Sequence, residues 1–253
     1  YYFAYGNKYD FDVEQQEKTS LWMKIKRVQN VFYGFWNLFF KKYDYLVFSD
    51  ILEIRLMNGR YVNKLAEGLI SELGKNKVLL IENPVGASHF KIPKVTKNII
   101  SLDFFLFFSS ALALLKRTFT IDNETILTEI NKKYDFAIDY RRLISIFICC
   151  KDFFTAFFRM HKPRLMFTTD YSNLVVQAII CIDKKLGIKT TELQHGSINK
   201  QHPIYNVFTK LDKLFFPDYL FVFGDSVKSV FGENNYFIKK DNVLPIGSMY
   251  IDY

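Results

Sequence analysis

Cysteine is scarce in this sequence of 253 residues, which contains Cys149, Cys150 and Cys181 only. Two of these cysteines are neighbours and none belongs to a CxxC pair, so the pattern argues against a disulfide framework and against a zinc site. The start of the sequence also lacks the charged and apolar regions of a signal peptide. These absences predict a reduced, cytoplasmic protein.

The standard phosphate- and metal-binding motifs are absent as well. The sequence contains no GxxxxGK[ST] loop, no GxGxxG after a strand, no GxSxG, no HExxH and no DxD. It therefore gives no support to a P-loop, a dinucleotide site, a nucleophile elbow or a zinc protease. Without DxD, a metal-dependent sugar-nucleotide site is also disfavoured, and we expect no metal and no resident cofactor.

Two features of the composition stand out: an excess of positive charge and a high content of aromatic residues. Lys and Arg exceed Asp and Glu by a formal net charge of +8, and aromatic residues make up 18% of the chain. A basic surface suits a phosphate-bearing ligand or an anionic membrane. The basic residues are spread along the chain without a recognition motif, so we do not expect nucleic acid as a partner. The apolar fraction of 49% is typical of a globular protein.

Strand and helix patterns alternate over residues 44–253. Apolar strands are predicted at 45–49, 77–81, 164–168, 188–193, 219–223 and 242–246, and helices at 62–73, 172–186 and from 226 onward. Strands separated by helices pair in parallel. We therefore predict an α/β fold with a Rossmann-like, doubly wound parallel sheet.

The segment 1–43 is predicted to be an amphipathic helical extension. Within 12–42, apolar residues recur at spacings of three and four, which places them on one helical stripe surrounded by lysines: Leu21, Ile25, Val28, Phe32, Phe35 and Phe39. Such a helix either packs on its own domain, which is the commoner case, or lies on an anionic membrane.

Residues near 85–160 interrupt the alternation with an aromatic-rich, helical insertion. The run 99–115 is apolar but contains Asp103 and two serines, so a buried or interfacial helix is favoured over a membrane span. Asp122 is a candidate cap for a helix through residue 133, and 140–160 has the pattern of a long helix.

Ligands of such sheets bind beyond the carboxyl ends of the strands. His195 follows a predicted strand directly, between Gln194 and Gly196, and histidine can exchange a proton near neutral pH. Asp170 is a second candidate base, although it could instead cap the next helix, and Asp225 has the same ambiguity. The alternative for His195 is a structural role in the loop. Asn83, Tyr171 and Ser172 lie at other strand ends.

The loop 197–216 carries His202 and several lysines, so it is either a basic lid over an anionic substrate or a solvated loop, the latter being favoured. His89 and His161 have no chemical partner nearby in the sequence, and we interpret both as structural or exposed.

The stretch 190–205 reads TTELQHGSINKQHPIY, and it is followed by YLFVFGD at 219–225 and NVLPIGSMYID at 242–252. Together these segments resemble the amino-terminal half of bacterial GT-B glycosyltransferases of capsule and O-antigen synthesis. The His-Gly turn is also similar to that of the CDP-glycerol glycerophosphotransferases. The resemblance covers residues 160–253 well and the first strands only in outline.

The resemblance implies an acceptor-binding domain that is one half of a GT-B fold, with the donor domain outside this sequence. It implies His195 as general base with Asp170 in reserve, and Gln194, Gly196, His202, Asn83, Tyr171, Ser172 and Asp225 as substrate contacts. Expected partners are a nucleotide-sugar co-substrate, a saccharide or lipid-linked acceptor, and the inner face of the plasma membrane. Two alternatives remain open: a CDP-glycerol-type phosphotransfer, and a non-catalytic membrane- or carbohydrate-binding module.

Overall fold

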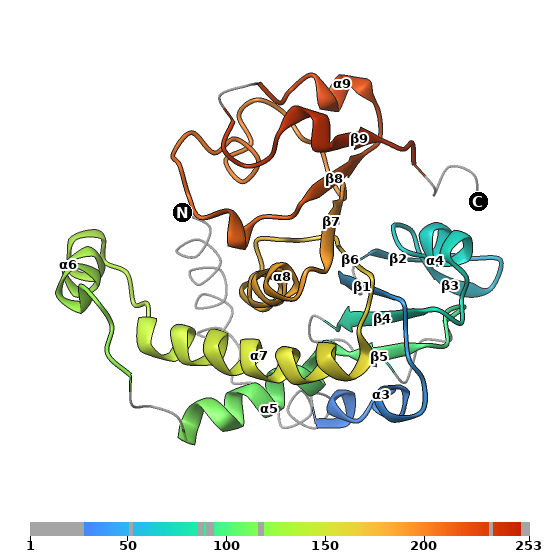
Figure 1. Ribbon diagram of the computed structural model, residues 1–253, viewed down its shortest axis with the longest axis horizontal. Helices are drawn as coiled ribbons and strands as arrows, with labels where there is room; N and C mark the ends of the chain where they lie inside the picture. Colours follow the sequence, from blue (N-terminus) through green and yellow to red (C-terminus); the bar gives the residue numbers. More distant parts are fainter. Residues whose placement is uncertain are drawn as a thin grey trace.

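The computed structural model describes residues 28–50, 53–84, 89, 94–115, 119–232 and 235–248. A sheet of seven parallel strands runs through it in the order β5-β4-β1-β6-β7-β8-β9 (Figure 1). The strands are β1 (Tyr45–Asp50), β4 (Val78–Asn83), β5 (Ile99–Ser101), β6 (Leu165–Thr168), β7 (Lys189–Leu193), β8 (Tyr219–Val222) and β9 (Val243–Pro245). The predicted Rossmann-like, doubly wound sheet is confirmed.

Helices cover both faces of this sheet. Helix α4 (Glu67–Leu73) packs on one face, over Val47, Val78 and Leu80. On the other face lie α5 (Leu102–Leu115), α7 (Tyr140–His161) and α8 (Leu174–Leu186), over a larger core rich in phenylalanine. The strands are continuous apolar runs because both of their faces are buried. The remaining helical pieces are α3 (Asn37–Phe40), α6 (Glu124–Tyr134), α9 (Asp225–Lys228), η3 (Lys213–Phe215) and η4 (Lys240–Asn242).

The strand order reverses between β1 and β6. From β1 the chain adds β4 and β5 on one side, and it then returns to place β6 against the other side of β1. A crevice forms at such a switch point because the two connections leave in opposite directions. The loops after β1 and β6 therefore border the place where a ligand is expected.

A β-hairpin precedes α4 and takes the first two residues of the predicted helix 62–73, and turns follow at 64–66. Strands β2 (Ile54–Met57) and β3 (Arg60–Asn63) pair antiparallel, and the helix begins only at Glu67. The turn is Asn58-Gly59, and both residues have positive φ, 49° and 74°. Asn-Gly is the strongest short hairpin signal because the tight turn needs that backbone shape. The signal was present in the sequence.

The insertion near 85–160 contains the edge strand β5, which the sequence analysis missed. The predicted helix over 99–115 is split, since Ile99–Ser101 pair with β4 and the helix starts at Leu102. Helix α6 is preceded by Asn123 in a left-handed conformation, so the cap prediction for Asp122 was wrong. Helix α7 matches the predicted long helix. None of the helices in the described part of the chain is both long and apolar enough to cross a membrane.

The predicted N-terminal helix lies partly outside the described residues, which begin at 28. From there the helix is not continuous: residues 32–36 form turns, Gly34 has φ 71°, and a second helical piece starts at Asn37. Gly34 is needed because the backbone approaches β5 closely. A Cβ at this position would overlap the carbonyl oxygen of Ile99 and lie 2.8 Å from its carbon. The segment therefore covers the edge strand, a common protection for sheet edges.

Candidate functional site

A crevice opens at the switch point, beyond the carboxyl ends of β1, β4 and β6. Its polar lining comes from the strand ends and the start of α8, and its floor is apolar. The lining residues are Phe48, Ser49, Asp50, Ile81, Asn83, Leu102, Thr168, Thr169, Asp170, Asn173 and Val176. Hydroxyls, amides and two carboxylates therefore face one small space, a set suited to the hydroxyl groups of a polyol.

Asp50 is the electrostatic centre of this crevice. Burial raises the pKa of its carboxyl, and a hydrogen bond from Asn83 opposes that rise. The negative charges of Asp170 and Glu53 raise the pKa further, whereas His195 lowers it. Asp50 therefore lies within electrostatic reach of both predicted catalytic residues. It ends a predicted strand, where the strand-end rule places ligand contacts, although no specific role was predicted for it.

Asp170 and Ser172 form a tight turn at the end of β6. The Asp170 Oδ1 atom accepts hydrogen bonds from the Ser172 backbone nitrogen at 2.9 Å and from its Oγ at 2.5 Å. The helix-cap interpretation of Asp170 was wrong, because α8 begins at Leu174 and its cap is Asn173, whose Oδ1 accepts from the Val175 nitrogen. Asp170 therefore stabilises this turn and also lines the crevice.

His195 stands exposed on the turn after β7. The turn is built by Gln194, whose amide donates to the Gly196 carbonyl at 2.8 Å and accepts from the Phe223 nitrogen at 2.8 Å. The Gln194 side chain is thus engaged in joining β7 to β8. At Gly196 a Cβ would meet nothing within 4 Å, so the missing side chain leaves room beside His195.

The loop 197–216 is anchored at its centre, while most of its residues, including Lys200, Lys210 and Lys213, are exposed, as expected for a solvated loop. Tyr171 donates from its hydroxyl to the Ile204 carbonyl, and Tyr205 donates to Glu192 Oε1 at 2.8 Å. His202, half-buried on this loop, packs on Tyr205 with ring centroids 5.0 Å apart. Burial lowers the pKa of His202, and the charge of nearby His195 lowers it further. The two histidines are therefore close enough to interact electrostatically.

Glu192 is a buried carboxylate beneath this loop. Burial raises its pKa well above the ordinary value, the hydrogen bond from Tyr205 opposes that rise, and the charge of Asp170 adds to it. Burial likewise raises the pKa of Tyr171, with further contributions from Glu192 and Asp170. Asp170, Tyr171, Glu192 and Tyr205 thus form one coupled group behind the crevice. Sequence spacing could not reveal it, because Tyr205 reaches Glu192 only through the course of the loop.

Asp225 lies farther from the crevice than the other predicted residues. It is exposed in the first turn of α9, and Gly224, not Asp225, is the N-cap residue. It follows β8, the third strand from β1, which places it about 14 Å away along the sheet at the usual strand spacing. The structure therefore brings Asn83 and Asp170 to the crevice, places His195 within electrostatic reach of Asp50, and leaves Asp225 at the periphery.

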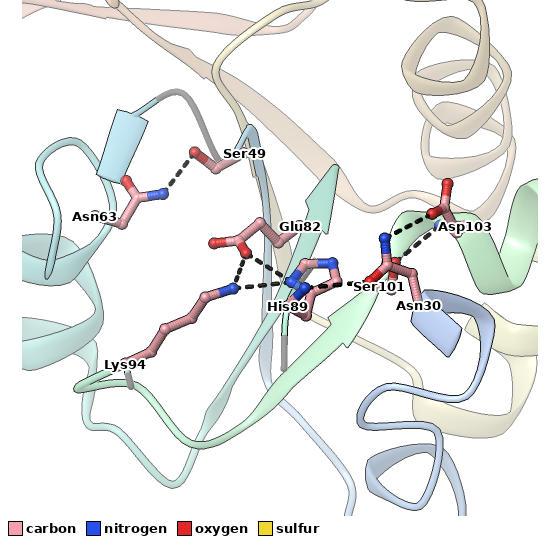
Figure 2. Close-up of polar contacts among 8 residues, drawn as sticks. All are labelled: Asn30, Ser49, Asn63, Glu82, His89, Lys94, Ser101 and Asp103. Carbon is pink, nitrogen blue, oxygen red and sulfur yellow. Dashed lines mark hydrogen bonds and ion pairs between the residues drawn. The ribbon is translucent and has the colours of Figure 1, made fainter. Parts of the chain in front are cut away.

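A second polar cluster is buried under the neighbouring strand end. Figure 2 shows Lys94 and His89 converging on the Oε1 atom of Glu82. The Lys94 ammonium is 2.9 Å from His89 Nδ1, and His89 Nδ1 is 3.0 Å from the carboxylate. Burial lowers the pKa of Lys94, against the charge of Glu82 that raises it. A buried ion pair of this kind is costly to leave unpaired, so the cluster fixes the end of β4.

The same cluster ties the N-terminal segment to the sheet. His89 stacks on Tyr33, with ring centroids 4.6 Å apart, and its backbone nitrogen donates to the Asn30 side chain. Asn30 in turn donates to Asp103 at the start of α5 (Figure 2). His89 is therefore buried and structural. His161 is also buried, against Phe157. Both burials agree with the interpretation of these histidines as structural or exposed.

Potential metal ligands do not gather anywhere in the part of the chain that the structure describes: no group of three or more His, Cys, Asp or Glu could hold an ion. Asp50 and Asp170 face the crevice as a pair only, which is consistent with carboxylates that contact hydroxyl groups.

Comparisons with known proteins give only a distant likeness. No family model matches the sequence, and no curated protein matches it. One similar solved structure is that of UDP-GlcNAc 2-epimerase from Neisseria meningitidis bound to UDP-GlcNAc. It is 14% identical, with a TM-score of 0.41, and the match covers 82% of this chain and 47% of that enzyme. The chain thus spans about half the length of the epimerase, and a likeness this distant carries no conclusion about activity or family.

Proposed function

We propose that this chain is the acceptor-binding half of a GT-B-type glycosyltransferase that acts in bacterial surface-polysaccharide synthesis. The observations that carry the proposal are that Asp50 and Asp170 line the crevice at the switch point of the sheet and that His195 lies within electrostatic reach of Asp50. A ligand in this crevice meets carboxylates that accept from hydroxyls, and it lies beside an exposed imidazole that can take a proton.

The proposed reaction is a direct displacement at the anomeric carbon of a nucleotide-sugar. His195 takes the proton of the acceptor hydroxyl, the acceptor oxygen forms a bond to the anomeric carbon, and the bond from that carbon to the phosphate oxygen breaks. The nucleotide leaves with the electron pair of that bond. Asp50 and Asp170 orient the acceptor by accepting hydrogen bonds from its other hydroxyls, which contributes to catalysis through positioning.

The charge of the crevice favours a saccharide acceptor over a phosphorylated one. Among the described residues that line it there are two carboxylates and neither lysine nor arginine. A phosphate placed here would meet two like charges without a lysine or arginine in the lining to offset them. The donor's phosphates are therefore assigned to the second domain of the GT-B arrangement, and glycerophosphate transfer in this crevice is the weaker candidate.

A donor screen tests the proposal. The protein as encoded by its gene is incubated with UDP-, GDP-, CMP- and CDP-linked donors and a panel of saccharides, and nucleotide release is measured alongside product mass. We expect one nucleotide-sugar to support transfer to a neutral saccharide, with the product heavier by one sugar. Product formation from CDP-glycerol alone would assign phosphotransfer instead. Saccharide binding without turnover on any donor would assign a non-catalytic module.

A further inference from the structure

The segment 28–40 carries apolar side chains on two sides, and one of these sides is buried against the described part of the protein while the other is largely exposed. Val31 and Leu38 are buried in the core with Leu102 and Phe105. The opposite side presents Val28, Phe32, Trp36 and Phe39, which are 54%, 57%, 62% and 61% exposed. These include three residues of the stripe predicted from sequence, and they point away from the core. A segment that is apolar all round is normally covered on every side.

The charged residues of this part of the sequence have one sign. Between Glu17 and Asp44 the sequence contains six lysines and arginines and no carboxylate. Two of these, Lys41 and Lys42, are exposed directly after α3, next to Phe39. Aromatic rings, tryptophan above all, combined with basic residues are the composition that settles at the boundary between lipid headgroups and acyl chains.

The surface is held firmly in place on the sheet. Gly34 lies against β5, the Ser101 nitrogen donates to the Tyr33 carbonyl at 3.2 Å, and the Asn37 side chain donates to the Ile99 carbonyl at 2.9 Å. Figure 1 shows α3 at the β5 edge of the sheet, next to the start of α5. Because its buried side is fixed, the exposed rings are preorganised and do not need to fold on contact.

We propose that Val28, Phe32, Trp36 and Phe39, with Lys41 and Lys42, form a membrane-contact surface that docks on an anionic bilayer. The rings enter the interface and the lysines meet the negative headgroups. This inference does not depend on the proposed glycosyl transfer. If both hold, the crevice lies two strands from the docked edge, about 10 Å along the sheet, so an acceptor carried by the membrane would be presented close to it.

The test is co-sedimentation of the protein with vesicles of phosphatidylcholine alone or with added phosphatidylglycerol. We expect binding that rises with phosphatidylglycerol and falls with salt. The double variant Phe32→Asp/Trp36→Asp should lose it. Lys41→Gln/Lys42→Gln should weaken it by roughly 30-fold, at about fivefold for each lysine near an anionic surface. The control Phe208→Asp removes a 73%-exposed ring elsewhere and should bind as wild type.

A second readout separates docking from damage to the fold. In a Trp22→Phe background Trp36 is the sole tryptophan, and its fluorescence should shift to the blue with anionic vesicles and be quenched by brominated lipid. Each variant must unfold at the wild-type temperature to be counted. The proposal would be overturned if the wild-type protein did not bind anionic vesicles, or if the Phe32→Asp/Trp36→Asp variant bound them as well as the wild type. The proposal would also be overturned if the wild-type protein eluted as a dimer in gel filtration and the Phe32→Asp/Trp36→Asp variant eluted as a monomer. The surface would then be a contact between two copies of the chain.

Discussion

Replacement of His195 by Ala is expected to lower the rate of sugar transfer by about 10²–10⁴-fold, the usual contribution of a positioned general base. The reason is that no other group at the turn after β7 can take the acceptor proton in the same place: Gln194 is engaged in the turn, and Gly196 has no side chain. His195→Gln should be equally impaired, because glutamine keeps a polar side chain but does not titrate near neutral pH. Initial rates at saturating donor and acceptor measure the effect.

Controls for this loss come from the same turn and loop. His195 is exposed, so either substitution should leave the free energy of unfolding within about 0.5 kcal/mol of wild type, as is usual for surface sites. Lys200→Ala, an exposed change five residues along the chain, should retain activity. Near-normal turnover of His195→Ala would show that His195 is not the general base, and Asp170 would then be the remaining candidate.

Replacement of Gly34 by Ala should destabilise the protein by roughly 2–5 kcal/mol. About 1–2 kcal/mol comes from the left-handed backbone, with φ 71°, and about 1–3 kcal/mol from forcing a methyl group against the Ile99 carbonyl. For a chain of this size each kcal/mol lowers the melting temperature by roughly 2–4 °C. Thermal unfolding followed by circular dichroism measures the change.

Gly59 provides the matched control. It has nearly the same backbone conformation, φ 74°, but a Cβ there would meet nothing within 4 Å. Gly59→Ala should therefore show only the backbone part, about 1–2 kcal/mol. The difference between the two variants isolates the contact of residues 28–40 with β5. Equal losses would mean that this close approach does not exist in solution.

The sheet could be predicted from sequence because its strands are buried on both faces. Runs such as 78–81 and 219–223 are apolar throughout, and helices α4 and α8 end at Gly74 and Gly187. The edge strand β5 could not be separated from the apolar helix that follows it without a break, since both are apolar. The N-terminal periodicity was real, yet Gly34 divides the helix because the chain must pass close to β5.

Individual residues of the candidate site could be predicted from the sequence, but which of them lie close together in space could not. The rule that ligands bind at strand ends selected Asn83, Asp170 and His195 from the strand ends alone. It also selected Asp225, which lies three strands from β1, because the sequence does not give the strand order. The strand-end rule could not select Tyr205 and Lys94, since neither lies at a strand end. They contact buried Glu192 and Glu82, from which they are separated by 13 and 12 positions in the sequence.

The most direct test of the account is an NMR titration of the histidine ring signals with neutral saccharides. The chain has four histidines: His195 is exposed beside the crevice, His202 is half-buried near His195, His89 is buried against Glu82, next to Asn83 of the crevice lining, and His161 is buried near Tyr43, at the other end of β1. A saccharide whose binding is detected by saturation-transfer NMR should shift the signals of His195 and His202 and leave that of His161 in place. Binding that moves neither His195 nor His202 would contradict a saccharide site at the switch point.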